Sequence, residues 1–468
     1  MILAFIFLFI SASPSVVDNT KTLQQLLNKN AGKTLTLPAG TFNVSTLNVS
    51  KQTKLTIGPK TILRGLPTTT ALPVLQLQAG VTLTGTGVVD GNRKVRTKGM
   101  GVLASQANNL IINGLRIKEV AEQGIHVVKS KGVILRNMVV TGCGAKGIDQ
   151  FQGIHLVISQ NVQVANCRVE NAQHGIQWWG DDTNGFCENI AIRNNIVRKV
   201  DGGGIWGYKG RKITVTTNNV AVCGDVGIDF ENSFNSIAIG NVVRDCKNHG
   251  LATFFASENI KFVNNRVVQG AAYGNGIGLC AEGLSKNISF IGGSISTKGP
   301  DACGLATVGS GIVQDVLVQG MRIVTEGKNG VPIRVLENNR FRIINNPLLS
   351  GISPIGVSLE GSSGSEVSGN TIVHAGTDGS GLNERGGVFM YYRSAQFPSK
   401  NNRVTNNTIR GFKTGINDDC WGDVNSNNVI EQNVTPNVVH RQSNGTWGGK
   451  AQQNVTAARV AAPVQVKQ

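Results

Sequence analysis

A short phrase that begins with glycine recurs along the middle of this chain, and it constrains the fold more than any other feature. The phrase reads Gly-Ile-Asp-Phe-Glu at Gly227–Glu231. Its first residue recurs at Gly124, Gly153, Gly175, Gly204, Gly250 and Gly276, so successive glycines are 29, 22, 29, 23, 23 and 26 residues apart. A period of roughly 20–50 residues indicates that one structural unit is stacked on itself.

A second phrase runs in step with the first and predicts a strand in every repeat. Apolar residues alternate with polar ones at Asn189–Asn194, and Ser236–Asn241 has a similar pattern. This alternation is typical of a half-buried strand. Each phrase is expected to end at one aligned turn position, because asparagine bonds to nearby backbone and tolerates left-handed geometry. The predicted ladder is Asn113, Asn137, Asn166, Asn194, Thr217, Asn241 and Asn264.

Short strands and turns at this period predict an all-β solenoid, whose coils lie ~4.8 Å apart. From about Leu75 to Val439 the chain resembles the right-handed parallel β-helix proteins, the superfamily of pectate lyases, polygalacturonases and phage tailspikes. The resemblance implies a single-stranded right-handed parallel β-helix with a short N-terminal capping helix. It says little about chemistry, because one fold supports many activities.

We expect four segments along the chain. Residues 1–13 are interpreted as a signal peptide, since an apolar run is followed by small residues, although a buried first strand is the alternative. Residues 14–74 hold the N-terminal cap and first coils, 75–440 the parallel β-helix catalytic domain, and 441–468 a flexible tail. The signal peptide predicts a secreted (extracellular) or periplasmic protein. No later run is long enough for stable membrane insertion.

Charge and cysteine content give weaker expectations. The formal charge of +17 favours a polyanionic partner, or simply maintains solubility. Phosphate-cradling loops and nucleic-acid motifs are absent from the sequence, so no nucleic acid is expected. Cys223 and Cys246 occupy equivalent positions in successive repeats, which permits a disulfide, but a stack of buried thiols is preferred.

One face of the solenoid is predicted to carry the function. In the glycine phrase, the third and fifth residues point outward, because alternate strand residues face opposite sides. Coil by coil these pairs are His126 and Val128, His155 and Val157, Gln177 and Trp179, Trp206 and Tyr208, Asp229 and Glu231, and Ala252 and Phe254. Exposed aromatic residues beside carboxylates predict a sugar-binding groove rather than a chance apolar patch. The two histidines bind substrate or are ordinary surface residues.

Asp229 and Glu231 are the predicted catalytic pair. They lie two apart on one strand, so their carboxyls are expected roughly 5–8 Å apart, within the range of glycosidase pairs. Their proximity should separate the two pKa values and leave one acid protonated. A solvated acidic pair and a calcium site are the alternatives. Further substrate contacts are expected from Asp181, Asp182, Lys209, Arg211 and His249.

The sequence resembles the superfamily but matches no subfamily. Polygalacturonase-like elements at Arg116–Lys118 and Asn417–Asp419 occur in reversed order, and the Gly-His-Gly element is missing. The first hypothesis is therefore a glycoside hydrolase that needs no cofactor. The second is a uronate lyase or epimerase, in which Lys209, Arg211 or a histidine is the base and Asp229, Glu231 and Asp181 hold Ca²⁺.

The third hypothesis belongs to another class, a non-catalytic glycan-binding adhesin or fibre. All three predict a polysaccharide or oligosaccharide partner, possibly anionic. The protein is expected to be a monomer or a homotrimer.

Overall fold

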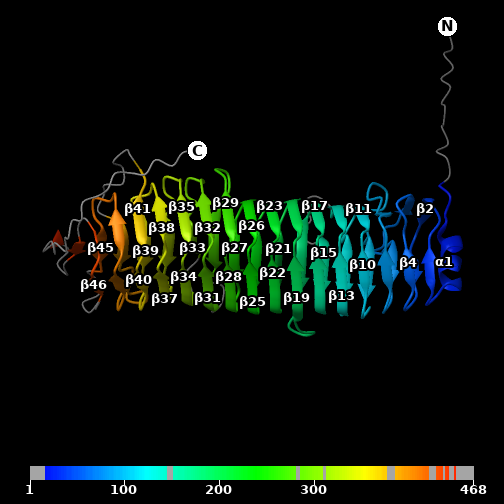
Figure 1. Cartoon of the computed structure of the whole chain (residues 1–468), viewed down its shortest axis with the longest axis horizontal. Coiled ribbons are helices and arrows are strands. Elements are labelled where there is room, and N and C mark those ends of the chain that lie inside the picture. Colours follow the sequence, from blue (N-terminus) through cyan, green and yellow to red (C-terminus); the bar gives the residue numbers. More distant parts are fainter. Residues whose placement is uncertain are drawn as a thin grey trace, which may run out of the picture.

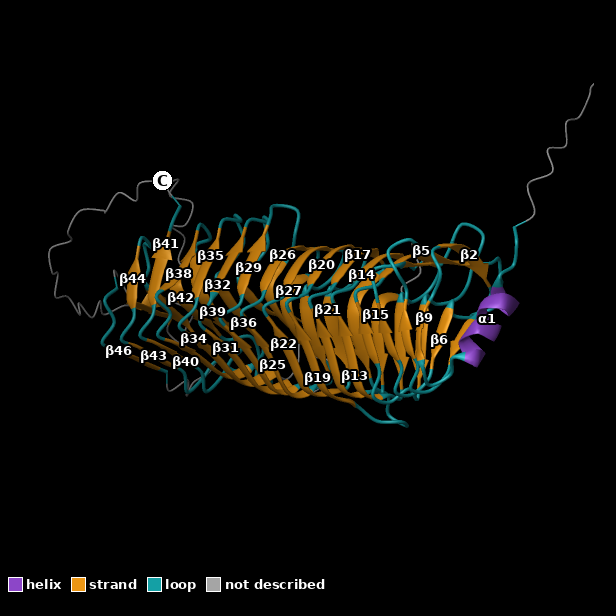
Figure 2. Ribbon diagram, turned by 45° about the vertical axis from the view of Figure 1, so that its right-hand side comes forward, coloured by secondary structure: helices purple, strands orange, loops and turns teal. Residues whose placement is uncertain are grey.

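The computed structural model describes residues 16–144, 151–280, 285–308, 313–376, 385–420, 428–435, 438–441 and 447–448. The predicted signal peptide and nearly all of the predicted tail lie outside these residues. The described chain forms an elongated parallel β-solenoid of about 14 turns (Figure 1). Helix α1 (Thr20–Lys29) covers its N-terminal end (Figure 2), so the predicted all-β solenoid with a short N-terminal helix is confirmed.

Each coil contributes strands in turn to three long parallel sheets. The first sheet contains β1 (Thr34–Thr36), β4 (Lys54–Thr56), β7 (Thr82–Thr84), β10 (Ile111–Asn113), β13 (Lys131–Arg136), β16 (Gln160–Ala165), β19 (Cys187–Arg193), β22 (Gly210–Thr216), β25 (Phe234–Ile239), β28 (Glu258–Val263), β31 (Ser285–Ile291), β34 (Val313–Gln319), β37 (Asn339–Ile344), β40 (Glu366–Ser368), β43 (Arg403–Thr405) and β46 (Val429–Glu431). The second sheet contains β2 (Gly40–Val44), β5 (Thr61–Gly65), β8 (Val88–Asp90), β11 (Arg116–Val120), β14 (Val139–Cys143), β17 (Arg168–Ala172), β20 (Ile196–Val200), β23 (Asn219–Cys223), β26 (Val242–Cys246), β29 (Arg266–Gln269), β32 (Ser294–Thr297), β35 (Arg322–Thr325), β38 (Leu348–Gly351), β41 (Thr371–His374) and β44 (Thr408–Arg410).

The third sheet carries the face that the sequence singles out. It contains β3 (Leu47–Val49), β6 (Leu75–Leu77), β9 (Val102–Ser105), β12 (Ile125–Val128), β15 (Gln152–Val157), β18 (His174–Trp179), β21 (Ile205–Tyr208), β24 (Ile228–Glu231), β27 (His249–Phe254), β30 (Asn275–Cys280), β33 (Leu305–Val308), β36 (Ile333–Leu336), β39 (Ile355–Glu360), β42 (Gly386–Tyr391), β45 (Ile416–Asp419) and β47 (Val438–Arg441). β48 (Trp447–Gly448) pairs antiparallel with β47.

The repeat glycines stand where each coil enters the third sheet, and close packing explains why they are glycines. A Cβ atom on Gly227 would lie 2.3 Å from Val243 Cγ1, and one on Gly153 would lie 2.3 Å from Val169 Cγ1. Both valines belong to the second sheet and point into the core. A side chain at any of the repeat glycines would therefore collide with a core valine or, at Gly276, with Ile295.

Aromatic rings fill the widest part of the core. Trp178 and Phe230 are fully buried, with ring centroids 5.5 Å apart. Gly207 lies in the coil between them, and a Cβ there would be 2.5 Å from Trp178 Cγ. The glycine therefore makes room for the indole, which explains why the coil of Gly207 has no apolar side chain at this core position.

The predicted asparagine ladder is only partly correct. Five of the seven positions align and have a positive φ, namely Asn137, Asn166, Asn194, Thr217 and Asn264. Asn241, however, belongs one residue further on, in a fully buried ladder with Asn195, Asn218 and Asn265. In this ladder each side-chain oxygen accepts a hydrogen bond from the preceding asparagine amide, so buried polar groups are satisfied in series.

A one-residue shift explains the misplaced asparagine. Thr214 pairs with Ile237 and Val215 with Ala238, so Ala238 points inward and Ile237 is half-buried on the outer side. The apolar alternation of Ser236–Asn241 predicted instead that Ile237 points inward and Ala238 points outward. Asn113 is displaced by one residue in the other direction, because it pairs with Arg136 rather than with Asn137. A slip of one residue exchanges the two faces of a strand.

The buried cysteines of the described residues carry free thiols. Cys223 and Cys246 are register partners on β23 and β26, and both are buried without a disulfide. The preference for a stack of buried thiols is thus confirmed for this pair. No helix among the described residues is long and apolar enough to cross a membrane.

Candidate functional site

The third sheet aligns the predicted site residues into two outward columns. The first column consists of His126, His155, Gln177, Trp206, Asp229 and Ala252. The second column consists of Val128, Val157, Trp179, Tyr208, Glu231 and Phe254. The register predicted from the glycine repeat is confirmed, and neighbours in a column lie on adjacent strands ~4.8 Å apart.

Asp229 and Glu231 lie together at the centre of this face, but their environment differs from the prediction. Asp229 has 0% exposure although it lies in an outward column, because the side chains around it on adjacent coils exclude solvent. Its carboxyl oxygens are buried and have no hydrogen-bond partner among the described residues, and the neighbouring Glu231 interacts with it electrostatically. Glu231 remains half-buried and is the accessible member of the pair.

Burial controls the protonation of both carboxyls. It raises the pKa of Asp229 well above its usual range, and the neighbouring Glu231 and Asp225 charges raise it further. Burial also raises the pKa of Glu231 to about 7, against the opposing effect of its interaction with Asp229. Glu231 therefore loses its proton as the pH rises through about 7. The main cause of both pKa shifts is desolvation.

Three aromatic rings lie beside the carboxyl pair. Trp179 is 36% exposed, and its ring centroid is 5.2 Å from that of Tyr208 and 6.0 Å from that of Trp206. The Tyr208 hydroxyl accepts a hydrogen bond from Asn232 at 3.3 Å. Because Tyr208 is the register partner of Glu231, an apolar platform directly adjoins the titrating carboxyl.

A loop after β18 brings the predicted acidic residues to the edge of this face. Asp181 accepts backbone hydrogen bonds from Thr183 and Asn184, so its carboxylate shapes the loop. Asp182 is largely exposed and forms an ion pair with Lys209. Lys209 is itself buried, with its ammonium 5.6 Å from the Tyr208 ring. The structure thus places Lys209 in an ion pair with the loop.

Arg211 lies outside this cluster. It is exposed on β22 in the first sheet, where its guanidinium stacks 3.7 Å from the centre of the Phe186 ring. Its register partners are Glu188 and Phe234. The structure therefore brings Lys209, but not Arg211, to the face that carries the carboxyl pair.

The two predicted histidines form a stack at the N-terminal side of the columns. The rings of His126 and His155 are 4.9 Å apart and inclined by only 9°. Burial lowers the pKa of His126 to about 4 and that of His155 to about 3, so both rings are neutral at neutral pH. Their ring nitrogens are buried and have no hydrogen-bond partner among the described residues. Such atoms are rare in native proteins and indicate a place where a polar group binds.

His174 is a candidate that the sequence reasoning missed. Its Nδ1 accepts hydrogen bonds from the Gly203 amide at 2.9 Å and from Trp206 Nε1 at 3.2 Å. The ring is buried and fixes the orientation of the indole in the first column. Its position directly before the repeat glycine Gly175, which it shares with His249 before Gly250, was the available signal.

His249 and Gln177 are more buried than predicted, whereas Phe254 is half-exposed. His249 lies over Gly278, where a Cβ would be 2.3 Å from the ring, and its Nδ1 is 3.4 Å from Asn275 Nδ2. Burial lowers its pKa to about 4. Gln177 is 3% exposed between His155 and Trp206. His249 and Gln177 lie beneath the exposed surface of the site. Phe254 extends the apolar surface of the site beyond Glu231.

The residues proposed for calcium do not fit that ion. Calcium takes about 6–8 oxygen ligands. Asp181 is engaged by its own loop, which leaves the single pair of Asp229 and Glu231. Within the described ranges, no group of three or more His, Cys, Asp or Glu side chains is arranged to hold a metal ion.

Comparisons with known proteins agree on the fold. A family model described as "Right handed beta helix region" matches residues 149–295. The A-module of mannuronan C-5 epimerase AlgE6 from Azotobacter vinelandii has a TM-score of 0.58 at 15% identity, covering 67% of this chain and 91% of that one. No curated protein matches the sequence.

Two other solved structures are similar over comparable lengths. A hyperthermoactive exopolygalacturonase from Thermotoga maritima has a TM-score of 0.46 at 15% identity, covering 67% of this chain and 84% of that one. The Dettilon tailspike protein has a TM-score of 0.48 at 15% identity, covering 81% of this chain and 66% of that one. The predicted resemblance to the right-handed β-helix proteins is confirmed by the family model over residues 149–295 and by the fold, and no subfamily is resolved.

Proposed function

We propose that this protein is a secreted or periplasmic enzyme that cleaves glycosidic bonds of a polysaccharide bound across the outer face of the third sheet. The observation that carries the proposal is Glu231, a half-buried carboxyl whose pKa is raised to about 7 beside an aromatic platform. A group that titrates near neutral pH both donates and accepts protons efficiently. Structural neighbours named as an epimerase and an exopolygalacturonase act in the same general field of carbohydrate chemistry.

The aromatic residues position the substrate in this proposal. Flat rings bind the apolar faces of sugars, while polar side chains around them fix orientation. Trp179 and Tyr208 precede Glu231 in the second column at successive coil spacings of ~4.8 Å. A sugar ring stacked on them places its glycosidic oxygen beside Glu231. His155 and Gln177 are then the nearest polar side chains in the first column.

Asp229 acts on the reaction through its effect on the ionisation of Glu231. It is fully buried and its pKa is raised well above the usual range, so we assign it as a positioning residue that does not reach the substrate. In a hydrolase, protonated Glu231 gives its proton to the leaving glycosidic oxygen as the glycosidic C–O bond breaks, and water adds to the sugar carbon. The proton that this water loses passes to solvent, from which Glu231 is protonated again. The rate of that reaction falls as pH rises through about 7.

A second candidate is elimination or epimerisation of a uronate. It is favoured by the formal charge of +17, which suits an acidic polymer. Here ionised Glu231 removes the proton next to the sugar carboxylate. In elimination a carbon–carbon double bond forms as the glycosidic C–O bond breaks, and the leaving oxygen takes a proton. This reaction needs the ionised form, so its rate rises through about pH 7.

The test is incubation of the purified protein with a panel of acidic and neutral polysaccharides, with and without EDTA. New reducing ends without ultraviolet absorbance of unsaturated uronates support hydrolysis, and both signals together support elimination. Nuclear magnetic resonance of recovered uronate polymers detects epimerisation. Loss of activity with EDTA contradicts the metal-independent step described here. Unchanged polymer length, unsaturation and stereochemistry across the panel contradict an enzyme and favour a glycan-binding adhesin or fibre.

A further inference from the structure

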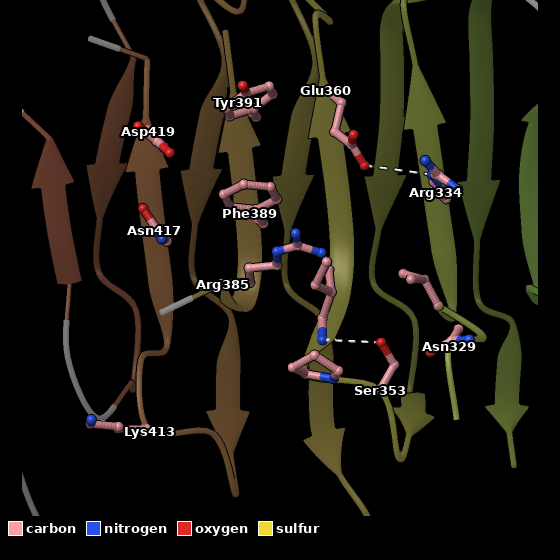
Figure 3. Close-up of a pocket in the computed structure, with 13 residues that line it drawn as sticks. Asn329, Arg334, Ser353, Glu360, Arg385, Phe389, Tyr391, Lys413, Asn417 and Asp419 are labelled. Atoms are coloured by element: carbon pink, nitrogen blue, oxygen red, sulfur yellow. Dashed lines mark hydrogen bonds and ion pairs between the residues drawn. The ribbon is translucent and has the colours of Figure 1, made fainter. Parts of the chain in front are cut away.

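A cleft of about 930 Å³ lies on the same face of the solenoid, in the C-terminal coils (Figure 3). Its floor is formed by β36, β39, β42 and β45. The two outward columns continue into it. Arg334, Ser358, Phe389 and Asn417 are register partners in the first column. Glu360, Tyr391 and Asp419 are register partners in the second. The cleft is therefore a second cluster built on the scaffold positions that hold Asp229 and Glu231.

Aromatic residues form the apolar part of the cleft. The rings of Phe389 and Tyr391 are stacked, with centroids 5.7 Å apart and planes inclined by 24°. Phe389 is 8% exposed and packs with Val331 and Ile355 in a small apolar cluster that is distinct from the solenoid core. This cluster lies on the outer face of the sheet, so it is not part of the solenoid core. Polar side chains surround it at the surface. This arrangement is typical of a site that binds a ligand with one apolar face.

Charged side chains border the aromatic pair in fixed positions. Glu360 accepts a hydrogen bond from Ser358 at 2.6 Å and pairs with Arg334 at 3.5 Å and Arg393 at 3.7 Å. Figure 3 shows Arg334 and Glu360 facing each other beside the aromatic strand, with Arg385 reaching across from the start of β42. The charged groups are thus held in a defined order around the rings before any ligand binds.

Cationic side chains outnumber carboxylates among the described residues that line the cleft. They are Arg334, Arg385 and Lys413 against Glu360 and Asp419, and Arg393, outside the lining, pairs with both Glu360 and Glu337. Planar guanidinium groups match the geometry of carboxylates. The cleft therefore combines a stacking platform with donors suited to an acidic group on the same ligand.

We propose that this cleft is a second saccharide-binding site, specific for a uronate unit that stacks on Phe389 and Tyr391. It shares the glycan chemistry of the proposed function and is independent of its catalytic step. Four coils separate Asp229 from Arg334 along the first column, or about 19 Å. A long polysaccharide laid along the third sheet reaches both clusters, so the cleft anchors the chain whose bonds are exposed to Glu231.

Calorimetric titration of the full-length Glu231→Gln protein tests the proposal without turnover. The probes are oligogalacturonate, oligomannuronate and a neutral galactan oligosaccharide. At least one uronate probe is expected to bind, and adding Tyr391→Ala weakens that binding about tenfold. The matched control Tyr392→Ala, one residue outside the cleft lining, leaves the affinity unchanged. Equal binding of the Tyr391→Ala and Tyr392→Ala proteins overturns the proposal.

Two further measurements distinguish a variant that does not fold from a failure of the cleft proposal itself. Lys413→Gln replaces a cleft side chain that is outside the solenoid core, and it is expected to weaken uronate binding while leaving the neutral probe unaffected. If Tyr391→Ala does not fold, unchanged uronate binding by Lys413→Gln overturns the proposal. Neutral galactan binding as tightly as uronate also overturns it. Retained uronate binding by a wild-type protein that modifies no polysaccharide rejects the proposed function and leaves the cleft proposal standing.

Discussion

At the residue scale, the central feature is a pair of carboxyls that are destabilised in their charged forms. Asp229 is fully buried and Glu231 half-buried, and both pKa values are raised chiefly by desolvation. The sequence predicted that the two carboxyls share one side of a strand, because alternate strand residues face the same side. It did not predict the burial, since alternation identifies a face and says nothing of what the adjacent coils place over it.

The pair predicts an unusual dependence of stability on pH. The pKa of Glu231 in the folded protein is about 7, above its value of 4.5 in an exposed carboxyl, so the stability present below pH 4.5 is lost as pH rises to 7. We expect Glu231→Gln to gain about 1–3 kcal/mol in unfolding free energy relative to wild type between pH 4.5 and 7. Urea titrations at several pH values measure this difference.

Glu258→Gln is the matched control for that experiment, because Glu258 lies on the first sheet in an ion pair with Lys286. The difference in unfolding free energy between the Glu258→Gln protein and wild type should vary much less over the same pH range. If the difference in unfolding free energy between the Glu231→Gln protein and wild type does not change with pH, Glu231 titrates normally and the assignment of a raised pKa is wrong.

At the element scale, each coil is held by close contacts that only particular residues permit. The glycine phrase was sufficient to predict the register of the third sheet, because each glycine meets a core valine or isoleucine of the second sheet. The asparagine positions were less predictable. Two different ladders, one at the turn and one fully buried, lie one residue apart, so a pattern of asparagines cannot separate them without the register.

Gly207→Ala should destabilise the solenoid. The added Cβ would lie 2.1 Å from the Trp178 carbonyl oxygen and 2.5 Å from the indole, and neither can withdraw from a filled core. Overpacking of this kind costs about 1–3 kcal/mol or more. Thermal or urea unfolding measures the loss. Gly58→Ala is the control, since its nearest contact is 3.9 Å away, and an equal effect of both substitutions would contradict this explanation of Gly207.

Asn218→Ala should interrupt the buried ladder. The Asn218 side chain donates to the Ile192 carbonyl at 3.0 Å and accepts from the Asn195 amide at 2.9 Å. Its removal leaves buried polar groups unpaired, at about 1–3 kcal/mol for each group. Asn113→Ala, at a half-buried turn, should cost much less. Similar urea midpoints for the two variants would show that the buried ladder contributes little.

At the scale of the whole molecule, the third sheet presents one continuous face with two clusters. The sequence revealed the first cluster because its coils are nearly regular. It did not reveal the second, because 31 residues separate Glu360 from its register partner Tyr391 and the simple period is lost there. Asn417–Asp419 stood out in the sequence only as a fragment of another family's motif, and its role as part of a cleft required the fold.

The charge of +17 predicts how the whole molecule responds to salt. Binding of a uronate polymer should weaken at least tenfold when sodium chloride is raised from about 0.05 M to about 0.5 M, because screening shortens the range of the protein's field. Binding of a neutral glycan should change little. Affinity electrophoresis at several salt concentrations measures both, and equal salt dependence would indicate that the positive charge does not contribute to glycan recognition.

The most direct test of the account is the rate at which wild-type and Glu231→Gln proteins convert the best polysaccharide of the panel between pH 5 and pH 9. We predict a wild-type kcat/KM governed by one ionisation near pH 7. The same account predicts a loss of about 10²–10⁴-fold in Glu231→Gln, with the Tyr392→Ala control unaffected. Equal rates for the wild-type and Glu231→Gln proteins, or a rate without an ionisation near pH 7, would contradict the assignment of Glu231 as the proton-transferring group.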